Sequence, residues 1–267
     1  MDDLAGRTAF ITGGASGIGL GIARACAAEG MKLAIVDVDG DALRAVEPAL
    51  SATTEVAAAV LDVRDREAYA RVADEVEARL GPVTLLCNNA GVGGVVSITN
   101  LSYEAWDWVI GINLHGVYNG LQTFVPRMIE RGAGGHVVNT GSASGLVAGG
   151  AGFLYNTSKF AVVGMSEALR LELAPHRIGL TVLCPGPVAT NIATTSRTFE
   201  PANLGVDDQF YDFFAAVIAA GKHPDEVGPM VLEGVRKNRP FVLTDDLIAE
   251  NFRARTQEIL DAMPPTA

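Results

Sequence analysis

The feature that most constrains the fold is a glycine-rich segment near the amino terminus. Residues 8–11 form a short apolar run of strand length, and the sequence Thr-Gly-Gly-Ala-Ser-Gly-Ile-Gly follows at 12–19. An alanine-rich stretch comes next and predicts a helix that ends near Gly30. A glycine-rich turn between a strand and a helix lets backbone amides approach a pyrophosphate, which the helix dipole also favours. The segment therefore predicts the first unit of a dinucleotide-binding α/β fold, with a plain tight turn as the alternative.

Further apolar runs of strand length alternate with helical patterns along the rest of the chain. The predicted strands lie at 8–11, 32–36, 56–63, 83–87, 136–140, 180–184 and 241–244. Further helices are predicted from near Asp41 and over 65–80, 102–131, 153–174, 225–237 and 247–263. No linker, repeat or low-complexity segment separates these elements. The alternation predicts one α/β domain over 1–267, a doubly wound parallel sheet of the Rossmann type with about seven strands.

The composition argues against several classes of protein. With 20 basic against 31 acidic residues, the formal net charge is −11, which argues against nucleic acid or an anionic membrane as a partner. No apolar run reaches the roughly 18 residues that span a membrane. The acidic start runs directly into the first strand and leaves no room for a signal peptide, so we expect a cytoplasmic protein. Neither a disulfide framework nor a metal site is expected from the spacing of Cys26, Cys87, Cys184, His115, His136, His176 and His223.

An acidic residue ends the second predicted strand. Asp37 lies 18 residues after Gly19. At about this separation a carboxylate can accept hydrogen bonds from both hydroxyls of an adenosine ribose, and it repels a 2′-phosphate. No arginine or lysine stands at Ser16 or directly after Asp37, so NAD is expected in preference to NADP. The alternative is that Asp37 caps the next helix, although Asp39 is better placed for that role.

Tyr155 and Lys159 are four residues apart in a predicted helix, so they lie one turn apart on the same face. A free tyrosine ionises near pH ~10 and is a weak base at neutral pH, whereas a cation beside it favours the phenolate. Ser142 follows the fifth predicted strand, 13 residues before Tyr155, and its hydroxyl can face the phenol. The pair predicts an acid–base site. The alternative is a surface tyrosine above a solvated lysine.

Two segments with asparagine are candidate parts of the same site. The sequence Asn-Asn-Ala-Gly at 88–91 ends the fourth predicted strand, at the sheet edge where ligands bind in open α/β sheets. Asn113 lies at an otherwise hydrophobic turn of the helix predicted over 102–131. A buried asparagine needs hydrogen-bond partners. Its position favours a local backbone bond, and the alternative is an amide aimed at the site.

The composition changes over residues 191–223, which we expect to form a loop and a helix. Five of the fifteen phenylalanine and tyrosine residues of the chain lie there: Phe199, Phe210, Tyr211, Phe213 and Phe214. Such a cluster can be a lid over a bulky apolar substrate. It can equally be a surface for packing between subunits.

Taken together, these residues resemble the short-chain dehydrogenase/reductase family, and the resemblance covers nearly the whole chain. Singly the matches are weak, but in this order and at the spacing of the family they are specific. The matching residues are Thr12, Gly13, Gly17, Gly19, Asp37, Asp62, Val63, Asn89, Ala90, Gly91, Asn113, Ser142, Tyr155, Lys159, Pro185, Gly186, Val188 and Thr190.

The resemblance implies a role for each of these residues. Tyr155 would be the general acid/base, Lys159 would lower its pKa and bind the nicotinamide ribose, and Ser142 would polarise the substrate oxygen. Asn113 would support a water that leads protons from Lys159 to solvent. The resemblance thus favours an amide aimed at the site over a local backbone bond. The cofactor would be held by Gly13, Ser16, Gly17, Ile18, Gly19, Asp37, Asp62, Val63, Asn89, Ala90, Gly91, Tyr155, Lys159, Pro185, Gly186, Val188 and Thr190. The substrate would be lined by Ser142, Ile192, Phe199, Phe210 and Phe214.

Four shorter segments resemble a narrower group, the Cα-dehydrogenases of lignin β-aryl ether breakdown. They lie at 65–70, 108–114, 124–129 and 191–193. This likeness implies that NAD oxidises a bulky, aromatic secondary alcohol. Within the one domain, we expect 1–190 to form the cofactor-binding and catalytic core, 191–223 a substrate lid, and 224–267 the last strand and C-terminal helices. A reductase of 3-oxoacyl or steroid-type ketones is one alternative, and a dinucleotide-binding regulator without turnover is another. The family habit implies a homotetramer or a homodimer.

Overall fold

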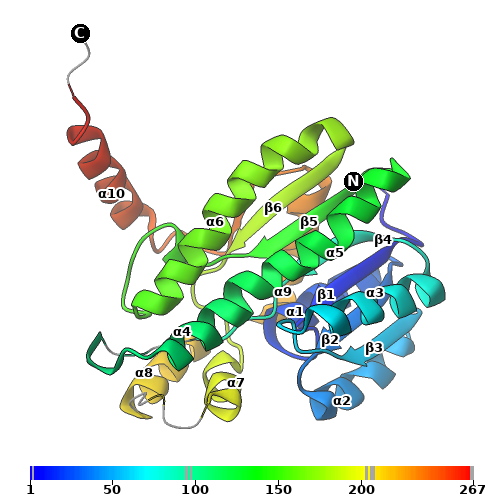
Figure 1. The fold of residues 1–267 in the computed structure, drawn as a ribbon, viewed down its shortest axis with the longest axis horizontal. Helices are drawn as coiled ribbons and strands as arrows, with labels where there is room; N and C mark the ends of the chain where they lie inside the picture. Colours follow the sequence, from blue (N-terminus) through cyan, green and yellow to red (C-terminus); the bar gives the residue numbers. More distant parts are fainter. Residues whose placement is uncertain (2, 94–95, 97, 202–203, 205–207, 265–267) are drawn as a thin grey trace.

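The structure, a computed structural model, describes residues 1, 3–93, 96, 98–201, 204 and 208–264, without the side chains of 208–210. Within this part of the chain, seven parallel strands form one sheet in the order β3-β2-β1-β4-β5-β6-β7 (Figure 1). The order reverses between β1 and β4, which leaves a crevice at their carboxyl ends. The predicted doubly wound parallel sheet is confirmed. The strands are β1 (Thr8–Thr12), β2 (Lys32–Asp37), β3 (Val56–Val60), β4 (Val83–Asn88), β5 (Gly135–Thr140), β6 (Ile178–Cys184) and β7 (Phe241–Leu243).

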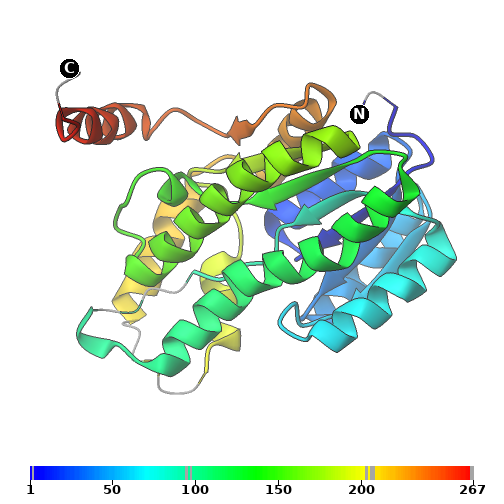
Figure 2. The same ribbon diagram turned by 45° about the horizontal axis from the view of Figure 1, so that its top comes forward.

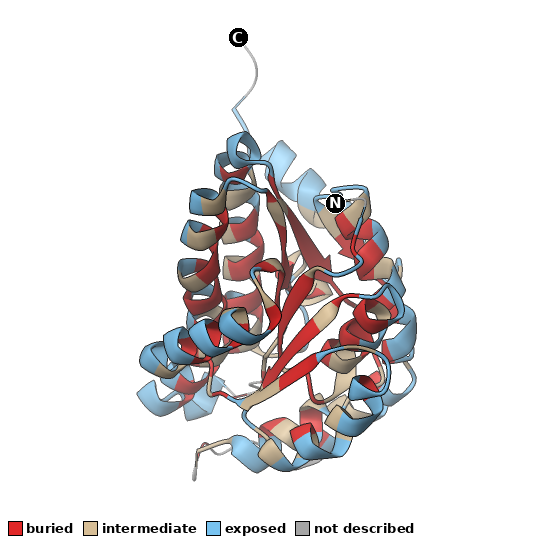
Figure 3. Cartoon of the chain, turned by 90° about the vertical axis from the view of Figure 1, so that its right-hand side faces the viewer, coloured by how far each residue is buried: buried red, intermediate tan, exposed pale blue. Residues whose placement is uncertain are grey.

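Helices cover both faces of the sheet, and buried residues concentrate in the strands and on the inward sides of the helices (Figure 3). One face of the sheet packs against α3, α5 and α6, and the other packs against α1, α2 and α9. Each of these helices turns an apolar stripe to the sheet and a polar face to solvent. Their bounds are α1 (Gly17–Ala28), α2 (Gly40–Ser51), α3 (Arg66–Leu80), α5 (Gly116–Arg131), α6 (Phe153–Leu173) and α9 (Pro224–Arg236).

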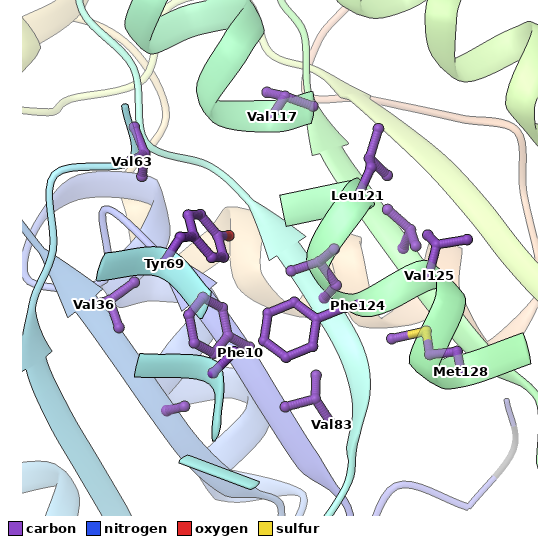
Figure 4. Close-up of a cluster of buried hydrophobic side chains, with 14 of the residues drawn as sticks. Phe10, Val36, Val63, Tyr69, Val83, Val117, Leu121, Phe124, Val125 and Met128 are labelled. Atoms are coloured by element: carbon purple, nitrogen blue, oxygen red, sulfur yellow. The ribbon is translucent and has the colours of Figure 1, made fainter. Parts of the chain in front are cut away.

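Three aromatic rings occupy the centre of the layer between β1, α3 and α5 (Figure 4). The ring centroid of Phe10 on β1 lies 4.7 Å from that of Phe124 on α5 and 5.7 Å from that of Tyr69 on α3. All three side chains are fully buried. Aromatic pairs at such separations contribute about 0.5–1.5 kcal/mol beyond the burial of their area. The rings therefore help to hold both helices on the strand whose carboxyl end carries the glycine-rich turn.

The first helix is fixed by direct backbone contact with α9. A Cβ atom on Gly21 would lie 2.2 Å from the carbonyl oxygen of Pro224, and one on Gly228 would lie 2.2 Å from the carbonyl oxygen of Gly21. Only glycine allows so close an approach of two helices. The contact fixes the N-terminus of α1, which is the part of the helix that faces a bound anion.

The helix predicted over 102–131 is interrupted. The structure has α4 (Tyr103–Ile110), a π-helical turn at Gly111–His115 and then α5. A π turn carries an extra residue, and such turns are frequent at functional sites. Hydrophobic periodicity alone did not reveal it, because the apolar face resumes after the turn. Asn113 lies inside the π turn and is completely buried.

Two further differences concern the ends of elements. β3 ends at Val60 rather than at Val63, because its neighbour β2 ends at Asp37, the residue that pairs with Val60. The described part of 191–223 contains two helices, α7 (Ile192–Phe199) and α8 (Asp208–Ala219), where one was expected. The other predicted boundaries differ by only a few residues.

The last helix, α10 (Ala249–Asp261), extends away from the body of the molecule (Figures 1 and 2). None of its residues is buried. The Arg255 guanidinium lies 5.2 Å from the ring centroid of Phe160 on α6. Across the described ranges, no helix combines the length and the apolar character that a membrane crossing requires.

Candidate active site

The glycine-rich turn connects β1 to α1 and lies beside the carboxyl end of β4. Gly17 has a φ of +50°, and a Cβ atom on it would lie 3.0 Å from Cγ2 of Thr190. The Thr12 hydroxyl accepts hydrogen bonds from the backbone amides of Asn89, at 2.9 Å, and Ala90, at 3.0 Å. Ser16 is the N-cap of α1, but its side chain makes no capping bond. The first amides of α1 thus remain available to an anionic group, and the closely packed glycines leave room for a pyrophosphate.

Asp37, the last residue of β2, is hydrogen-bonded to the glycine-rich turn. Its Oδ2 accepts a hydrogen bond from the Ala15 amide at 3.1 Å, and its Oδ1 accepts one from the Asp39 amide at 3.1 Å. Burial raises the pKa of the Asp37 carboxyl, and these backbone bonds oppose part of the rise. Asp39 caps α2 through the amides of Asp41 and Ala42, as predicted. Asp37 is therefore not the cap, and its carboxylate lines a cleft beside the turn.

Arg64 lies at the same end of the cleft, and the sequence reasoning missed it. Its guanidinium binds the Asp62 carboxylate with Nε 3.0 Å from both oxygens and Nη2 2.6 Å from Oδ2. Burial alone would raise the pKa of Asp62, but the Arg64 hydrogen bonds and charge lower it below its ordinary value. A search of residues just after each predicted strand would have found Arg64, because that edge of a parallel sheet is the ligand edge.

Tyr155 and Lys159 lie one turn apart on α6, which their spacing had predicted. The Lys159 ammonium is 5.6 Å from the Tyr155 ring centroid and donates a 3.0 Å hydrogen bond to the Thr140 carbonyl. Lys159 is 4% exposed, which rules out the alternative that Tyr155 lies at the surface above a solvated lysine. Its burial lowers the pKa of its ammonium to about 8.

The hydroxyl of Ser142 meets the Tyr155 phenol. Burial raises the pKa of Tyr155, and a hydrogen bond with Ser142 opposes part of that rise. This differs from the predicted depression by Lys159, because desolvation disfavours the phenolate. Ser142 Oγ accepts a 3.1 Å hydrogen bond from the Ser144 amide. Its own proton is the one that it can donate toward the Tyr155 oxygen.

Asn113 does not make the local backbone bond that its position favoured. Its Oδ1 accepts from the Val92 amide at 2.8 Å, and its Nδ2 donates to the Val92 carbonyl at 2.9 Å and to Ser158 Oγ at 3.1 Å. A Cβ atom on Gly91 would lie 3.2 Å from Asn113 Oδ1 and 3.5 Å from Lys159 Nζ. Asn113 thus holds the segment after β4 close to the Lys159 ammonium.

One cleft brings most of the predicted site residues together. Those that line it are Gly13, Ser16, Gly17, Ile18, Asp37, Asp62, Val63, Asn89, Ala90, Gly91, Tyr155, Lys159, Pro185, Thr190, Ile192 and Phe199. Six predicted residues lie outside the lining: Gly19, Asn113, Ser142, Gly186, Val188 and Phe214. The Phe210 side chain lies outside the described residues. Lining residues missed from the sequence are Val38, Leu61, Arg64, Val92, Trp108, Ile112, Thr140, Gly141, Asn191 and Thr195.

The aromatic residues of 191–223 do not share one environment. Phe199 lines the cleft, whereas Tyr211 is 3% exposed between α7 and α8, where its hydroxyl donates to Glu200 Oε2 at 2.6 Å. Phe213 is 64% exposed. The described side chains thus divide between the cleft, the packing of the two helices and the surface.

The arrangement combines a glycine-rich turn at a helix N-terminus, the Asp37 carboxylate and a buried Tyr–Lys pair in one cleft. Over residues 7–201 the chain matches the family model described as short chain dehydrogenase. The chain belongs to the short-chain dehydrogenase family. It is therefore an oxidoreductase, which confirms the resemblance found in the sequence.

Among the described residues, no cluster of three or more His, Cys, Asp or Glu side chains could hold a metal ion.

Three relatives within the family are informative. The C alpha-dehydrogenase of Sphingobium sp. (strain NBRC 103272 / SYK-6) is 36% identical over 99% of this chain and 89% of its own length. The 3beta-hydroxysteroid dehydrogenase 2 of Eggerthella lenta is 35% identical over 76% of this chain and 78% of its own. A short chain dehydrogenase/reductase of Burkholderia phymatum, solved in complex with NAD, is 32% identical, with a TM-score of 0.92 over 100% of this chain and 99% of that one.

Proposed function

We propose that this short-chain dehydrogenase oxidises a bulky, aromatic secondary alcohol to the ketone with NAD as the oxidant. The observation that carries the proposal is that one cleft is lined both by the glycine-rich turn and Asp37 and by Tyr155 and Lys159. A cofactor that spans this cleft would have its pyrophosphate on the turn and its nicotinamide beside the phenol. When bound, NAD supplies the hydride acceptor and a positive charge near the phenol.

The preference for NAD over NADP rests on the charges at the adenosine end. The Asp37 carboxylate lines the cleft and would repel a 2′-phosphate. Arg64 lines the same cleft, but Asp62 already engages its guanidinium as a fork-to-fork pair. The charge of Arg64 is thereby largely balanced and gives little attraction to an additional phosphate. The other predicted cofactor residues that line the cleft are assigned on that position. Gly19, Gly186 and Val188 lie outside the lining and are assigned on the resemblance to the family alone.

The proton chemistry falls to Tyr155 and Ser142. Ser142 would donate a hydrogen bond to the substrate oxygen, and the Tyr155 phenolate would take the alcohol proton in the oxidative direction. Lys159 would hold the nicotinamide ribose and favour the phenolate, because its buried ammonium is close to the ring. Asn113 keeps the backbone after β4 beside that ammonium, and we assign to it the support of a water path from Lys159 to solvent.

The aromatic substrate class is supported by the lining at the Tyr155 end. Trp108, Ile112, Ile192 and Phe199 present apolar surface to the cleft. Apolar walls with few polar groups fit an aryl ring attached to the carbinol carbon. The similarity to a C alpha-dehydrogenase points to the same class.

We assign 1–190 to the core, 191–223 to a lid and 224–267 to the last strand and C-terminal helices. We expect the protein to form a homotetramer or a homodimer.

A steroid-type alcohol is the second candidate, because the same apolar walls and the similarity to a hydroxysteroid dehydrogenase favour it. The deciding experiment is a side-by-side assay with NAD⁺ and NADP⁺ on aryl carbinols, alkyl carbinols and hydroxysteroids. Tyr155→Phe is the control. We expect turnover of aryl carbinols with NAD⁺ and its loss in the variant. Turnover restricted to alkyl carbinols or hydroxysteroids would reject the aromatic class, and activity that survives in Tyr155→Phe would reject the site.

A further inference from the structure

Helix α7 forms one wall of the cleft through residues spaced along one face. Ile192, Thr195 and Phe199 line the cleft, whereas Ala193 and Ser196 are the buried residues of the helix. The distance of this wall from the Tyr155 phenol therefore depends on how the buried face of α7 is held. Ala193 provides only a methyl group for packing. Ser196, which is 0% exposed, can also provide a directional bond.

The Ser196 hydroxyl bonds the segment that follows β4. Its Oγ accepts a 2.9 Å hydrogen bond from the Gly93 amide, and this bond is buried. A Cβ atom on Gly93 would lie 3.2 Å from Cε1 of Phe214 on α8 and 3.8 Å from Ser196 Oγ. Glycine at this position thus lets the backbone pass close to both helices of the 191–223 region.

The same short segment is bonded on its other side to the catalytic helix. The residue before Gly93 is Val92, whose amide and carbonyl are both bonded to Asn113. Asn113 Nδ2 donates to Ser158 Oγ at 3.1 Å, and the Ser158 hydroxyl donates to the Tyr155 carbonyl at 2.8 Å. Four buried hydrogen bonds and one part-buried bond therefore connect α7 to the backbone of Tyr155 through two adjacent residues, Val92 and Gly93.

We propose that Ser196 is a positioning residue, which fixes the substrate wall formed by α7 at the distance from Tyr155 that the alcohol requires. It does so through the Gly93 amide and does not touch the reacting atoms. The inference rests on the proposed function, because the alcohol is the ligand that the wall contacts. Cofactor binding does not depend on the bond, since the glycine-rich turn and Asp37 are held by Thr12, Ala15 and Asp39.

Ser196→Ala tests the proposal, with Thr198→Ala as the matched control. Thr198 lies on the exposed side of the same helix, and its hydroxyl bonds only the Thr194 carbonyl within the described residues. The full-length enzyme is assayed with NAD⁺ and the best aryl carbinol of the panel above. For Ser196→Ala we expect the KM of the alcohol to rise about tenfold, because a buried amide loses its acceptor. The KM of NAD⁺ and the pH profile of kcat should stay unchanged, and Thr198→Ala should behave as the parent enzyme.

A second readout does not depend on turnover. In the presence of NAD⁺, trypsin should cleave after Arg197 several-fold faster in Ser196→Ala, while cleavage after Arg66 on α3 should keep its rate. An unchanged alcohol KM with unchanged cleavage overturns the proposal. So does a parallel rise of both KM values, or an equal effect of Thr198→Ala. If no alcohol is turned over, the function proposed above fails, and the cleavage rates alone decide whether Ser196 holds α7.

Discussion

The Lys159 ammonium lies 5.6 Å from the ring centroid of Tyr155 and donates its 3.0 Å hydrogen bond to the Thr140 carbonyl, not to the phenol. The pKa of Tyr155 is raised by its burial, and a hydrogen bond with Ser142 opposes part of that rise. In the function proposed above, the two groups have separate roles. Lys159 would favour the phenolate and hold the ribose, and Ser142 would hydrogen-bond the substrate oxygen.

Replacement of Tyr155 by phenylalanine should abolish turnover and leave cofactor binding intact. Removal of a general acid/base costs about 10²–10⁴ in rate, so kcat should fall by about three orders of magnitude. The ring keeps its packing on α6, and the Kd of NADH, measured by fluorescence, should change less than about twofold. A large loss of NADH affinity would mean that the hydroxyl serves mainly to bind the cofactor.

Lys159 should leave a signature in the pH dependence of stability. Its pKa is lowered from 10.5 to about 8 by burial, so between these values the unfolded chain binds more protons than the folded one. The contribution of Lys159 to the free energy of unfolding therefore rises with pH across this window, by about 3 kcal/mol at the limit.

Lys159→Met isolates that contribution, because cysteines and tyrosines titrate in the same range. The parent protein should gain stability relative to Lys159→Met as the pH increases from 7.5 to 10.5, measured by urea unfolding at each pH. A constant difference between the two proteins across the range would show that the ammonium is not desolvated in the fold.

The sequence was sufficient for the architecture and for the arrangement of Tyr155 and Lys159 on one helix. Strand-length runs followed by glycine or small polar residues predicted the sheet, and a spacing of four predicted that Tyr155 and Lys159 share a helix face. These features are local, so periodicity and turn chemistry reveal them. The seven predicted strands are all present among the described residues.

The relations that depend on distant segments could not be predicted. Asn113 bonds Val92 across 21 residues, and Ser196 bonds Gly93 across 103. Such bonds follow from how helices pack on the sheet, which no spacing in the sequence encodes. The π turn that contains Asn113 was not predicted either, because the helical pattern of apolar residues continues on both sides of it.

Asp37 should control the choice between NAD and NADP. Asp37→Asn keeps the size of the side chain and an oxygen acceptor for the Ala15 amide, but removes the charge that repels a 2′-phosphate. The ratio of kcat/KM for NADP⁺ to that for NAD⁺ should rise by about 10²-fold, because a close like-charge contact costs a few kcal/mol. Asp39→Asn is the control, because it removes a neighbouring negative charge and alters the cap of α2 but keeps the Asp37 carboxylate. A ratio that does not change would locate the discrimination elsewhere in the cleft.

Gly120 on α5 should be essential for packing against β4 and α3. A Cβ atom there would lie 2.1 Å from Asn88 Oδ1 and 2.7 Å from the Tyr69 hydroxyl oxygen. Among the described residues neither oxygen has a hydrogen-bond partner, so both already carry a desolvation cost. Gly120→Ala would force α5 away from the ring cluster of Phe10, Tyr69 and Phe124, and such overpacking costs about 1–3 kcal/mol.

Gly164 on α6 supplies the matched control for Gly120→Ala. A Cβ atom at Gly164 would meet nothing within 4 Å, so Gly164→Ala adds the same methyl group to a helix without a clash. Alanine is favoured over glycine inside a helix by about 0.5–1 kcal/mol. Thermal unfolding should therefore show Gly120→Ala below the parent protein in Tm and Gly164→Ala at or slightly above it. Equal melting temperatures for the two variants would mean that the layer between β4 and α5 can expand to accept the extra methyl group.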